Sequence, residues 1–81
     1  MIREFDRVVL NINLPAKKLK KGDIGTVVMI HPKVILAPTK ATGFEVEFFT
    51  LEGKTLSVET LLPKQIRPVK TNEVAHVREV A

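Results

Sequence analysis

The chain has 81 residues, of which 44% are hydrophobic and 27% are charged, and its formal net charge is +4. This length accommodates one small domain and leaves no room for a cofactor-binding domain beside a substrate domain. Cysteine is absent, which excludes a disulfide scaffold, a cysteine nucleophile and a thiolate metal site. No apolar run approaches the roughly 18 residues of a membrane span, and the N-terminus lacks the apolar segment of a signal peptide. We therefore expect a soluble, cytoplasmic protein without membrane contact.

The first half of the chain contains two runs that are rich in β-branched residues, 7–10 and 26–30. Stiff β-branched side chains favour a pleated surface, so both runs are predicted to be strands. The segment Asn11–Ile24 between them contains Pro15 and Gly22, which interrupt regular structure. It is predicted to be a long loop.

Two alternating runs follow in the second half of the chain. Residues 44–49 place Glu45 and Glu47 on one face, and the other face carries Phe44, Val46 and Phe48. Residues 55–59 alternate again, which predicts that Leu56 and Val58 face inward. A period of two is typical of a strand that is buried on one side.

The loop Leu51–Gly53 between these runs fits a three-residue hairpin turn with its glycine in the left-handed conformation. This turn predicts that Phe48 lies opposite Leu56 and that Val46 lies opposite Val58. A two-residue loop would break the apolar face, because a slip of one residue moves every side chain of a strand to the other face.

The predicted elements after residue 61 are shorter and less regular than the strands before them. Residues 62–65 are predicted to form one helical or 3₁₀ turn that begins at Pro63. Residues 66–69 are predicted to form a short strand that Pro68 confines to an edge or to a strand end. For the tail 71–81 three alternatives remain open, namely a short helix capped by Asn72, an extra strand, and fraying. Five short strands with tight turns favour a sheet that curls into a small barrel, because curling hides the edges.

Four segments resemble an uncharacterised bacterial family of stand-alone SH3-like small domains, a domain of unknown function. They are Phe5–Leu10, Leu19–Val28, Glu45–Phe48 and Ile66–Pro68. The resemblance implies an all-β, five-stranded SH3-like small barrel over residues 1–70 with a C-terminal tail over 71–81, and it implies no activity. The first half also looks like a KOW motif, a module of ribosomal proteins and elongation factors that contacts RNA or proteins. In an SH3-like barrel, Asn11–Ile24 takes the place of the RT loop and His31–Gly43 that of the n-Src loop.

The basic residues gather in the first long loop, where four lysines stand within five residues: Lys17, Lys18, Lys20 and Lys21. Clustered ammonium groups can neutralise phosphates and release counterions, which makes this loop a candidate nucleic-acid site. A solvated loop that keeps the domain soluble is an equally good reading. The chain has no Trp, no Tyr and only four Phe, so it offers few rings on which bases could stack or that could line a groove for proline-rich peptides.

The second long loop, His31–Gly43, contains three adjacent aliphatic residues: Val34, Ile35 and Leu36. Exposing them would be costly, so we expect them to cover one mouth of the barrel or to pack against another protein or a second copy of the chain.

The carboxylates and histidines are weaker evidence for a functional site than the two long loops. In the chosen register Glu45 lies opposite Glu59 with Glu47 nearby, a set that could bind a hard cation or act in acid/base chemistry, although a solvated face is the simpler reading. His31 and His76 are far apart in the sequence and predict no metal site. No nucleophile–base pair, phosphate loop or dinucleotide fingerprint is present. We therefore expect no cofactor and no small-molecule substrate.

The sequence thus predicts a small interaction module that is not an enzyme. Its first expected partner is a protein, or a second copy of itself, contacted through the Asn11–Ile24 and His31–Gly43 loops. The alternative is RNA or DNA binding through the four lysines, and a third class is an enzyme that uses the glutamates.

Overall fold

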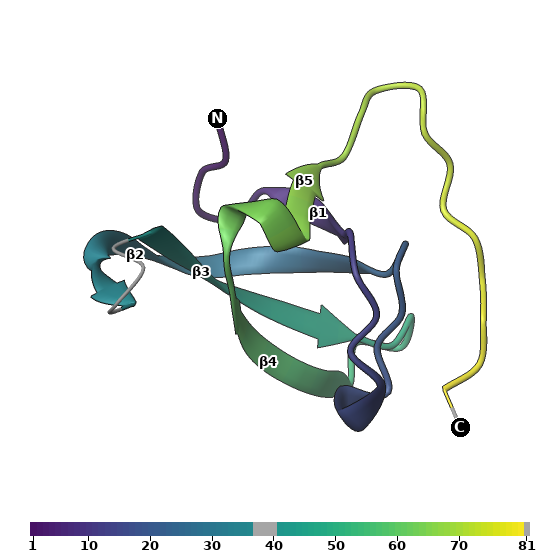
Figure 1. Cartoon of the computed structure of the whole chain (residues 1–81). Coiled ribbons are helices and arrows are strands. Elements are labelled where there is room, and N and C mark those ends of the chain that lie inside the picture. Colours follow the sequence, from purple (N-terminus) through teal and green to yellow (C-terminus); the bar gives the residue numbers. More distant parts are fainter. Residues whose placement is uncertain (37–40, 81) are drawn as a thin grey trace.

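The computed structural model describes residues 1–36 and 41–80, and for residues 33–36 it describes the backbone but not the side chains. Within this part of the chain, five antiparallel strands form one sheet in the order β4-β3-β2-β1-β5 (Figure 1). The strands are β1 (Arg7–Leu10), β2 (Ile24–Leu36), β3 (Ala41–Phe49), β4 (Thr55–Leu61) and β5 (Ile66–Pro68). Two 3₁₀ turns, η1 (Pro15–Lys17) and η2 (Pro63–Gln65), lie in the connections.

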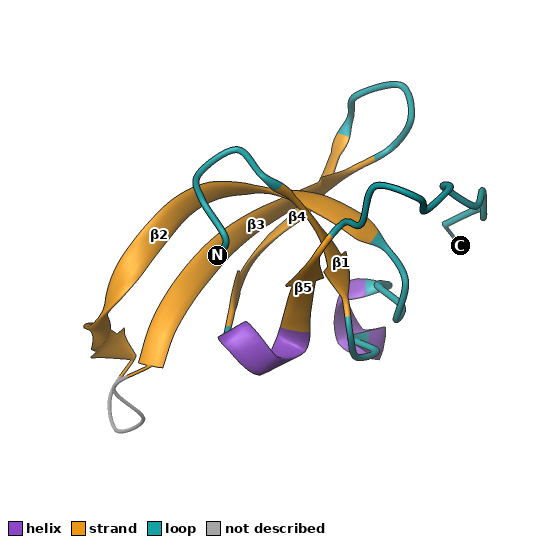
Figure 2. Cartoon of the chain, turned by 90° about the horizontal axis from the view of Figure 1, so that it is seen from above, coloured by secondary structure: helices purple, strands orange, loops and turns teal. Residues whose placement is uncertain are grey.

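The sheet is strongly curved, and β2 and β3 bend across the whole molecule (Figure 2). Its two edges are β4 and β5, which do not pair with each other, so hydrogen bonding does not close the sheet. The predicted all-β fold is confirmed, whereas closure into a barrel is not. The predicted strand at residues 7–10 and the helical turn that begins at Pro63 are also confirmed.

The core lies on the concave side of the sheet and receives side chains from every strand and from one loop. Its buried members are Val8, Leu10, Leu19, Val27, Phe44, Val46, Phe48, Leu61 and Ile66. Leu19 stands in the lysine-rich loop and is fixed there by a bridge to Leu14. The loop is therefore attached to the core by one apolar side chain, although the residues around it are polar.

Gly25 lies in β2 at a position where a side chain would collide with residues of β3. A Cβ atom at this position would lie 2.5 Å from Cγ1 of Val46 and 3.0 Å from the carbonyl oxygen of Glu47. The contact with the Val46 side chain is shorter than packed atoms tolerate and the contact with the Glu47 carbonyl is tight, so a larger residue would force its neighbours to move.

The hairpin between β3 and β4 has the predicted turn but not the predicted register. Gly53 has a φ of 89° and its N–H donates to the carbonyl of Thr50 at 2.8 Å, as expected for a three-residue loop. Beyond the turn, Phe49 lies opposite Thr55 but Phe48 lies opposite Ser57, so β4 contains one extra residue.

This bulge reverses the faces of β4. Val46 lies opposite Glu59 instead of Val58, and Phe48 lies opposite Ser57 instead of Leu56. Leu56 and Val58, which were predicted to face inward, are 39% and 50% exposed. The prediction was wrong because it continued the register of the turn along the strand, whereas one inserted residue moves every later side chain to the other face.

The second long connection is shorter than predicted. Residues 31–36 belong to β2 and residues 41–43 to β3, so most of the expected loop His31–Gly43 is strand. The aliphatic run Val34–Leu36 has the composition of a strand, and Pro32 falls where the pairing of β2 with β3 is irregular. The side chains of Val34, Ile35 and Leu36 lie outside the described residues.

The tail after β5 takes neither of the regular forms predicted for it. It is neither helix nor strand over residues 71–80, and it runs back along the molecule in an extended course (Figure 1). Two ion pairs, described below, connect it to the rest of the chain.

The two adjacent phenylalanines at the end of β3 test the placement of the core. Phe48 is 1% exposed and Phe49 is 43% exposed. We expect Phe48→Ala to lower the free energy of unfolding by about 3–5 kcal/mol, because it leaves a cavity in the core. Phe49→Ala should cost much less. Urea unfolding of both variants checks this, and equal losses would contradict the described orientation of β3.

Candidate functional site

The lysine-rich loop has a defined backbone. Lys18 adopts the left-handed conformation at the end of η1, with a φ of 60°. The N–H of Lys20 donates to Oδ2 of Asp23 at 2.8 Å, and the N–H of Lys21 donates to Oδ1 of Asn13 at 2.9 Å. The four lysines predicted as a site therefore stand on a structured loop.

The lysine side chains themselves are exposed. Nζ of Lys17 lies 3.9 Å from Oε2 of Glu59, a distant ion pair across to β4. Within the described residues, Lys18, Lys20 and Lys21 form no ion pair shorter than 4.0 Å. Three of the four ammonium groups thus remain available to an anionic partner.

Asp23 is the one acidic residue in the segment 11–24, and it accepts hydrogen bonds from the tail. Nε of Arg78 donates to Oδ1 at 2.8 Å and Nη2 donates to Oδ2, while Nη2 also donates to the carbonyl of Lys18. Partial burial raises the pKa of the Asp23 carboxyl, but the hydrogen bonds from Arg78 and from the N–H of Lys20 outweigh it and lower the pKa overall.

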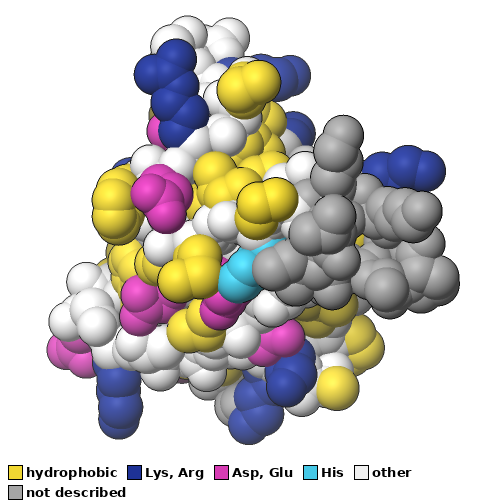
Figure 3. Space-filling model, turned by 90° about the vertical axis from the view of Figure 1, so that its left-hand side faces the viewer, with side chains coloured by type: hydrophobic (Ala, Val, Ile, Leu, Met, Phe, Trp, Pro, Cys, Tyr) yellow, Lys and Arg dark blue, Asp and Glu magenta, His cyan; other side chains and the backbone are white. Residues whose placement is uncertain are grey.

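The convex side of β2, β3 and β4, which we call the outer face, carries exposed apolar side chains. Met29, Phe49 and Val58 are 48%, 43% and 50% exposed, and they come from three neighbouring strands. Hydrophobic and acidic side chains alternate around a histidine on the side of the molecule shown in Figure 3. Sequence reasoning missed Val58 because the bulge was not foreseen.

Two carboxylates lie on the outer face, each with a polar neighbour. Oε2 of Glu45 is in close contact with Nε2 of His31, and Oε2 of Glu47 accepts a hydrogen bond from the Thr55 hydroxyl at 2.5 Å. The predicted pairing of Glu45 with Glu59 is wrong, since Glu45 lies opposite Thr60. The three glutamates therefore do not form one cluster.

Glu59 lies on the other face of β4. Its carboxylate accepts a hydrogen bond from the hydroxyl of Ser57 and faces the ammonium of Lys17, and its side chain is only 16% exposed. The bulge that turns Val58 outward is what turns this charged residue inward.

The described residues contain no group of three metal-ligating side chains, and none of the helical turns there could span a membrane. His31 lies on β2 and His76 in the tail, beside a different surface. Among the described residues we therefore find no constellation for metal chemistry.

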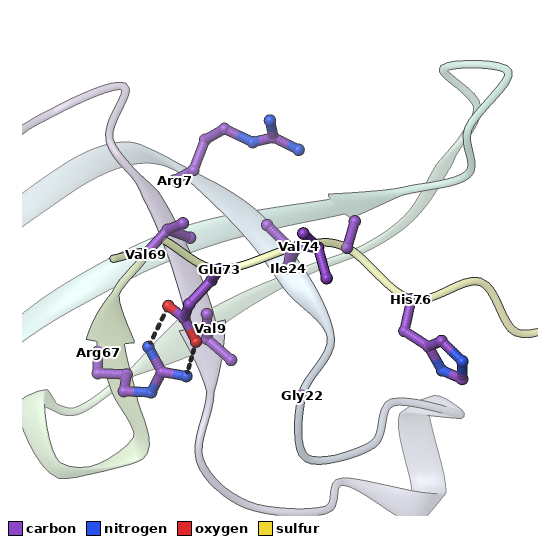
Figure 4. A pocket seen from close by; sticks show the side chains of 10 residues that line it. Arg7, Val9, Gly22, Ile24, Arg67, Val69, Glu73, Val74 and His76 are labelled. Atoms are coloured by element: carbon purple, nitrogen blue, oxygen red, sulfur yellow. Dashed lines mark hydrogen bonds and ion pairs between the residues drawn. The ribbon is translucent and has the colours of Figure 1, made fainter. Parts of the chain in front are cut away.

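The tail is anchored at two points. Nη1 and Nη2 of Arg67 donate to the two carboxylate oxygens of Glu73 at 2.8 and 2.6 Å, and the N–H of Lys70 donates to the same group at 2.7 Å. The second anchor is the pair between Arg78 and Asp23. A cavity of about 260 Å³ lies between the tail and the start of β2, with Val9, Ile24 and Val74 on its walls (Figure 4).

The first anchor predicts a pH-dependent release of the tail. The hydrogen bonds from Arg67 and from the N–H of Lys70 lower the pKa of the Glu73 carboxyl to about 2. Because the pKa is lower in the anchored state, the anchor is at full strength above the ordinary carboxyl pKa and is lost as the pH falls toward 2.

We therefore expect the amide resonances of residues 70–76 to become mobile between about pH 4.5 and pH 2 in heteronuclear NOE measurements. Glu73→Gln should produce the same mobility at pH 7, whereas Glu52→Gln in the hairpin loop should not. Rigid tail amides in Glu73→Gln at pH 7 would show that the ion pair does not hold the tail.

The comparisons with known proteins give one match. No curated protein and no solved structure is similar to this chain. A family model described as a domain of unknown function, DUF4926, matches residues 4–68, which include all five strands but not the anchored tail. The uncharacterised small-domain family that the sequence resembles is thereby identified, and the chain belongs to the DUF4926 family.

Proposed function

We propose that this chain is a protein-interaction module of SH3-like architecture that carries out no catalysis and binds its partner through the outer face of β2, β3 and β4. The strand order β4-β3-β2-β1-β5, the hairpin between β3 and β4, and the 3₁₀ turn before β5 support the SH3-like assignment. The observation that carries the binding role is the exposure of Met29, Phe49 and Val58 on one convex surface.

Burial of these side chains supplies the driving force for binding. A fully buried Met, Val or Phe side chain gains about 1.5–3 kcal/mol, so covering the exposed half of each gains roughly 1 kcal/mol. Three such contacts at the centre of a polar surface have the arrangement of a small interface core with a polar rim.

The charges on this face favour a particular partner chemistry. Glu45 and Glu47 are acidic residues on a protein whose net charge is +4, so the outer face differs in sign from the lysine-rich loop. Charge complementarity favours a segment that combines aliphatic side chains with Lys or Arg. The sequence predicted binding through the Asn11–Ile24 and His31–Gly43 loops, and the side chains of Val34, Ile35 and Leu36 in the second of these lie outside the described residues.

Affinity capture from an extract of the native cell tests this role. We expect wild-type protein to retain a specific protein, and we expect Met29→Asp and Phe49→Asp to lose it, because each places a charge in the contact. Leu51→Asp is the matched control, since Leu51 is 90% exposed but lies in the hairpin loop. Equal capture by all four proteins would exclude the outer face as the binding surface.

Nucleic-acid binding is the second candidate, and the ordered backbone beneath Lys18, Lys20 and Lys21 favours it. A structured loop loses less conformational entropy when it meets a phosphate backbone. The same three ammonium groups form no ion pair in the described part of the chain.

Binding to a fluorescein-labelled 20-nucleotide RNA distinguishes the two candidates. If the loop is the site, the logarithm of the association constant should fall with the logarithm of the salt concentration with a slope of about −2 to −3, and replacing the three lysines by alanine should abolish binding. A protein captured equally after nuclease treatment and by the triple variant would assign the function to the outer face instead.

A further inference from the structure

The two edges of the sheet differ in how well they are protected from pairing with another strand. β5 is three residues long and ends in Pro68, and the tail that follows it is anchored by Arg67. Short length, proline and a covering segment are the devices by which proteins block an edge. The edge formed by β5 is therefore closed to a further strand.

The opposite edge lacks these devices. β4 is seven residues long, contains no Pro, Lys or Gly, and pairs only with β3 among the described strands. Every second residue of an edge strand turns its N–H and C=O away from the sheet, where they can pair with a new strand. The single inward charge, Glu59, is already matched by Ser57 and Lys17, so it does not by itself block pairing.

The sequence of β4 is complementary to itself in an antiparallel arrangement centred on Val58. In that register Val58 faces Val58 of the second copy, Leu56 faces Thr60, and Ser57 faces Glu59. No charge lies directly opposite a like charge, and the hydroxyl of Ser57 can donate to the second copy's Glu59 as it does within one chain. Val58 is 50% exposed, and the Val58 side chain of the second copy would cover one side of it.

We propose that two copies of this chain associate through β4, antiparallel and with Val58 on the twofold axis, to form one continuous sheet. This inference goes beyond the proposed function, because the second copy adds a strand to the open edge of the sheet and does not cover Met29 or Phe49. It extends that function because the outer faces of the two copies then adjoin, and Met29 and Phe49 of each copy remain on the surface beside the joint.

The expected interface is small. Seven residues of strand and a pair of half-exposed side chains fall below the roughly 800 Å² per partner that stable interfaces bury. The dimer should therefore be reversible and dependent on concentration, with the monomer and dimer exchanging in solution.

A charge-exchange experiment tests the register. Val58→Lys and Val58→Glu each place like charges opposite one another, so each variant alone should be monomeric in sedimentation velocity runs at a concentration where wild type is dimeric. An equimolar mixture should form a heterodimer, because the two charges are then opposite in sign. Val77→Lys, in the tail, is the matched control, because Val77 is 72% exposed and lies away from β4, and this variant should dimerise like the wild type. Circular dichroism confirms that each variant is folded.

Disulfide trapping provides a second, independent measurement, because the chain has no cysteine of its own. Directly opposed residues of an antiparallel pair have Cα atoms about 4.5–5.5 Å apart, which suits a disulfide. Val58→Cys should therefore form a covalent dimer in mild oxidant. In Thr60→Cys the two thiols would be offset by four residues, roughly 14 Å along the strands, and should not join.

The outcomes separate this inference from the proposed function. Monomeric wild type at every concentration, a mixture of Val58→Lys and Val58→Glu that stays monomeric, or equal trapping at positions 58 and 60 would each overturn the β4 pairing. The outer face would then still stand as a binding surface if Met29→Asp abolishes capture of another protein. If dimerisation does not depend on Val58 and capture of another protein does not depend on Met29, both proposals fail.

Discussion

The single extra residue in β4 determines which surfaces this molecule presents. Without the bulge opposite Phe48, the strand would bury Leu56 and Val58 and expose Ser57 and Glu59. With it, the interior receives a carboxylate that needs Ser57 and Lys17 beside it, and the exterior receives an uncovered valine at an open edge. A domain of this size that uses a strand to expose apolar side chains reduces its own core, since few other residues can replace them.

The apolar residues that β4 does not contribute to the core are replaced by residues from segments outside the sheet. Leu19 enters the core from the lysine-rich loop. Three partly buried residues from other connections, Ile2, Ile12 and Leu14, pack against the core cluster. Regions that look like solvated connectors in the sequence thus contribute to stability. This also explains why the basic loop has a fixed backbone, because its central apolar residue is buried while its ammonium groups point to solvent.

Much of the fold follows from local sequence, and the exceptions have clear physical causes. The composition of residues 7–10, the alternation of residues 44–49 and the proline that begins η2 each act locally, and each predicted its element correctly. The bulge in β4 could not be foreseen, because the residues around Leu56 alternate regularly and no Gly or Pro among them signals an insertion. The extension of β2 beyond His31 was missed because Pro32 indicated a loop. The second tail anchor joins Asp23 and Arg78, which are 55 positions apart in the sequence, and no local pattern indicates such a pair.

Asp23 connects two parts of the molecule that the sequence keeps separate. Its carboxylate accepts one hydrogen bond from the N–H of Lys20 in the loop and two from Arg78 near the end of the chain. The loop and the tail are therefore both held by the Asp23 carboxylate. By thermodynamic linkage, a group that competes for this carboxylate in the loop also weakens the attachment of the tail. Arg78 also donates to the carbonyl of Lys18, so the end of the chain and the backbone of the lysine-rich loop are ordered together.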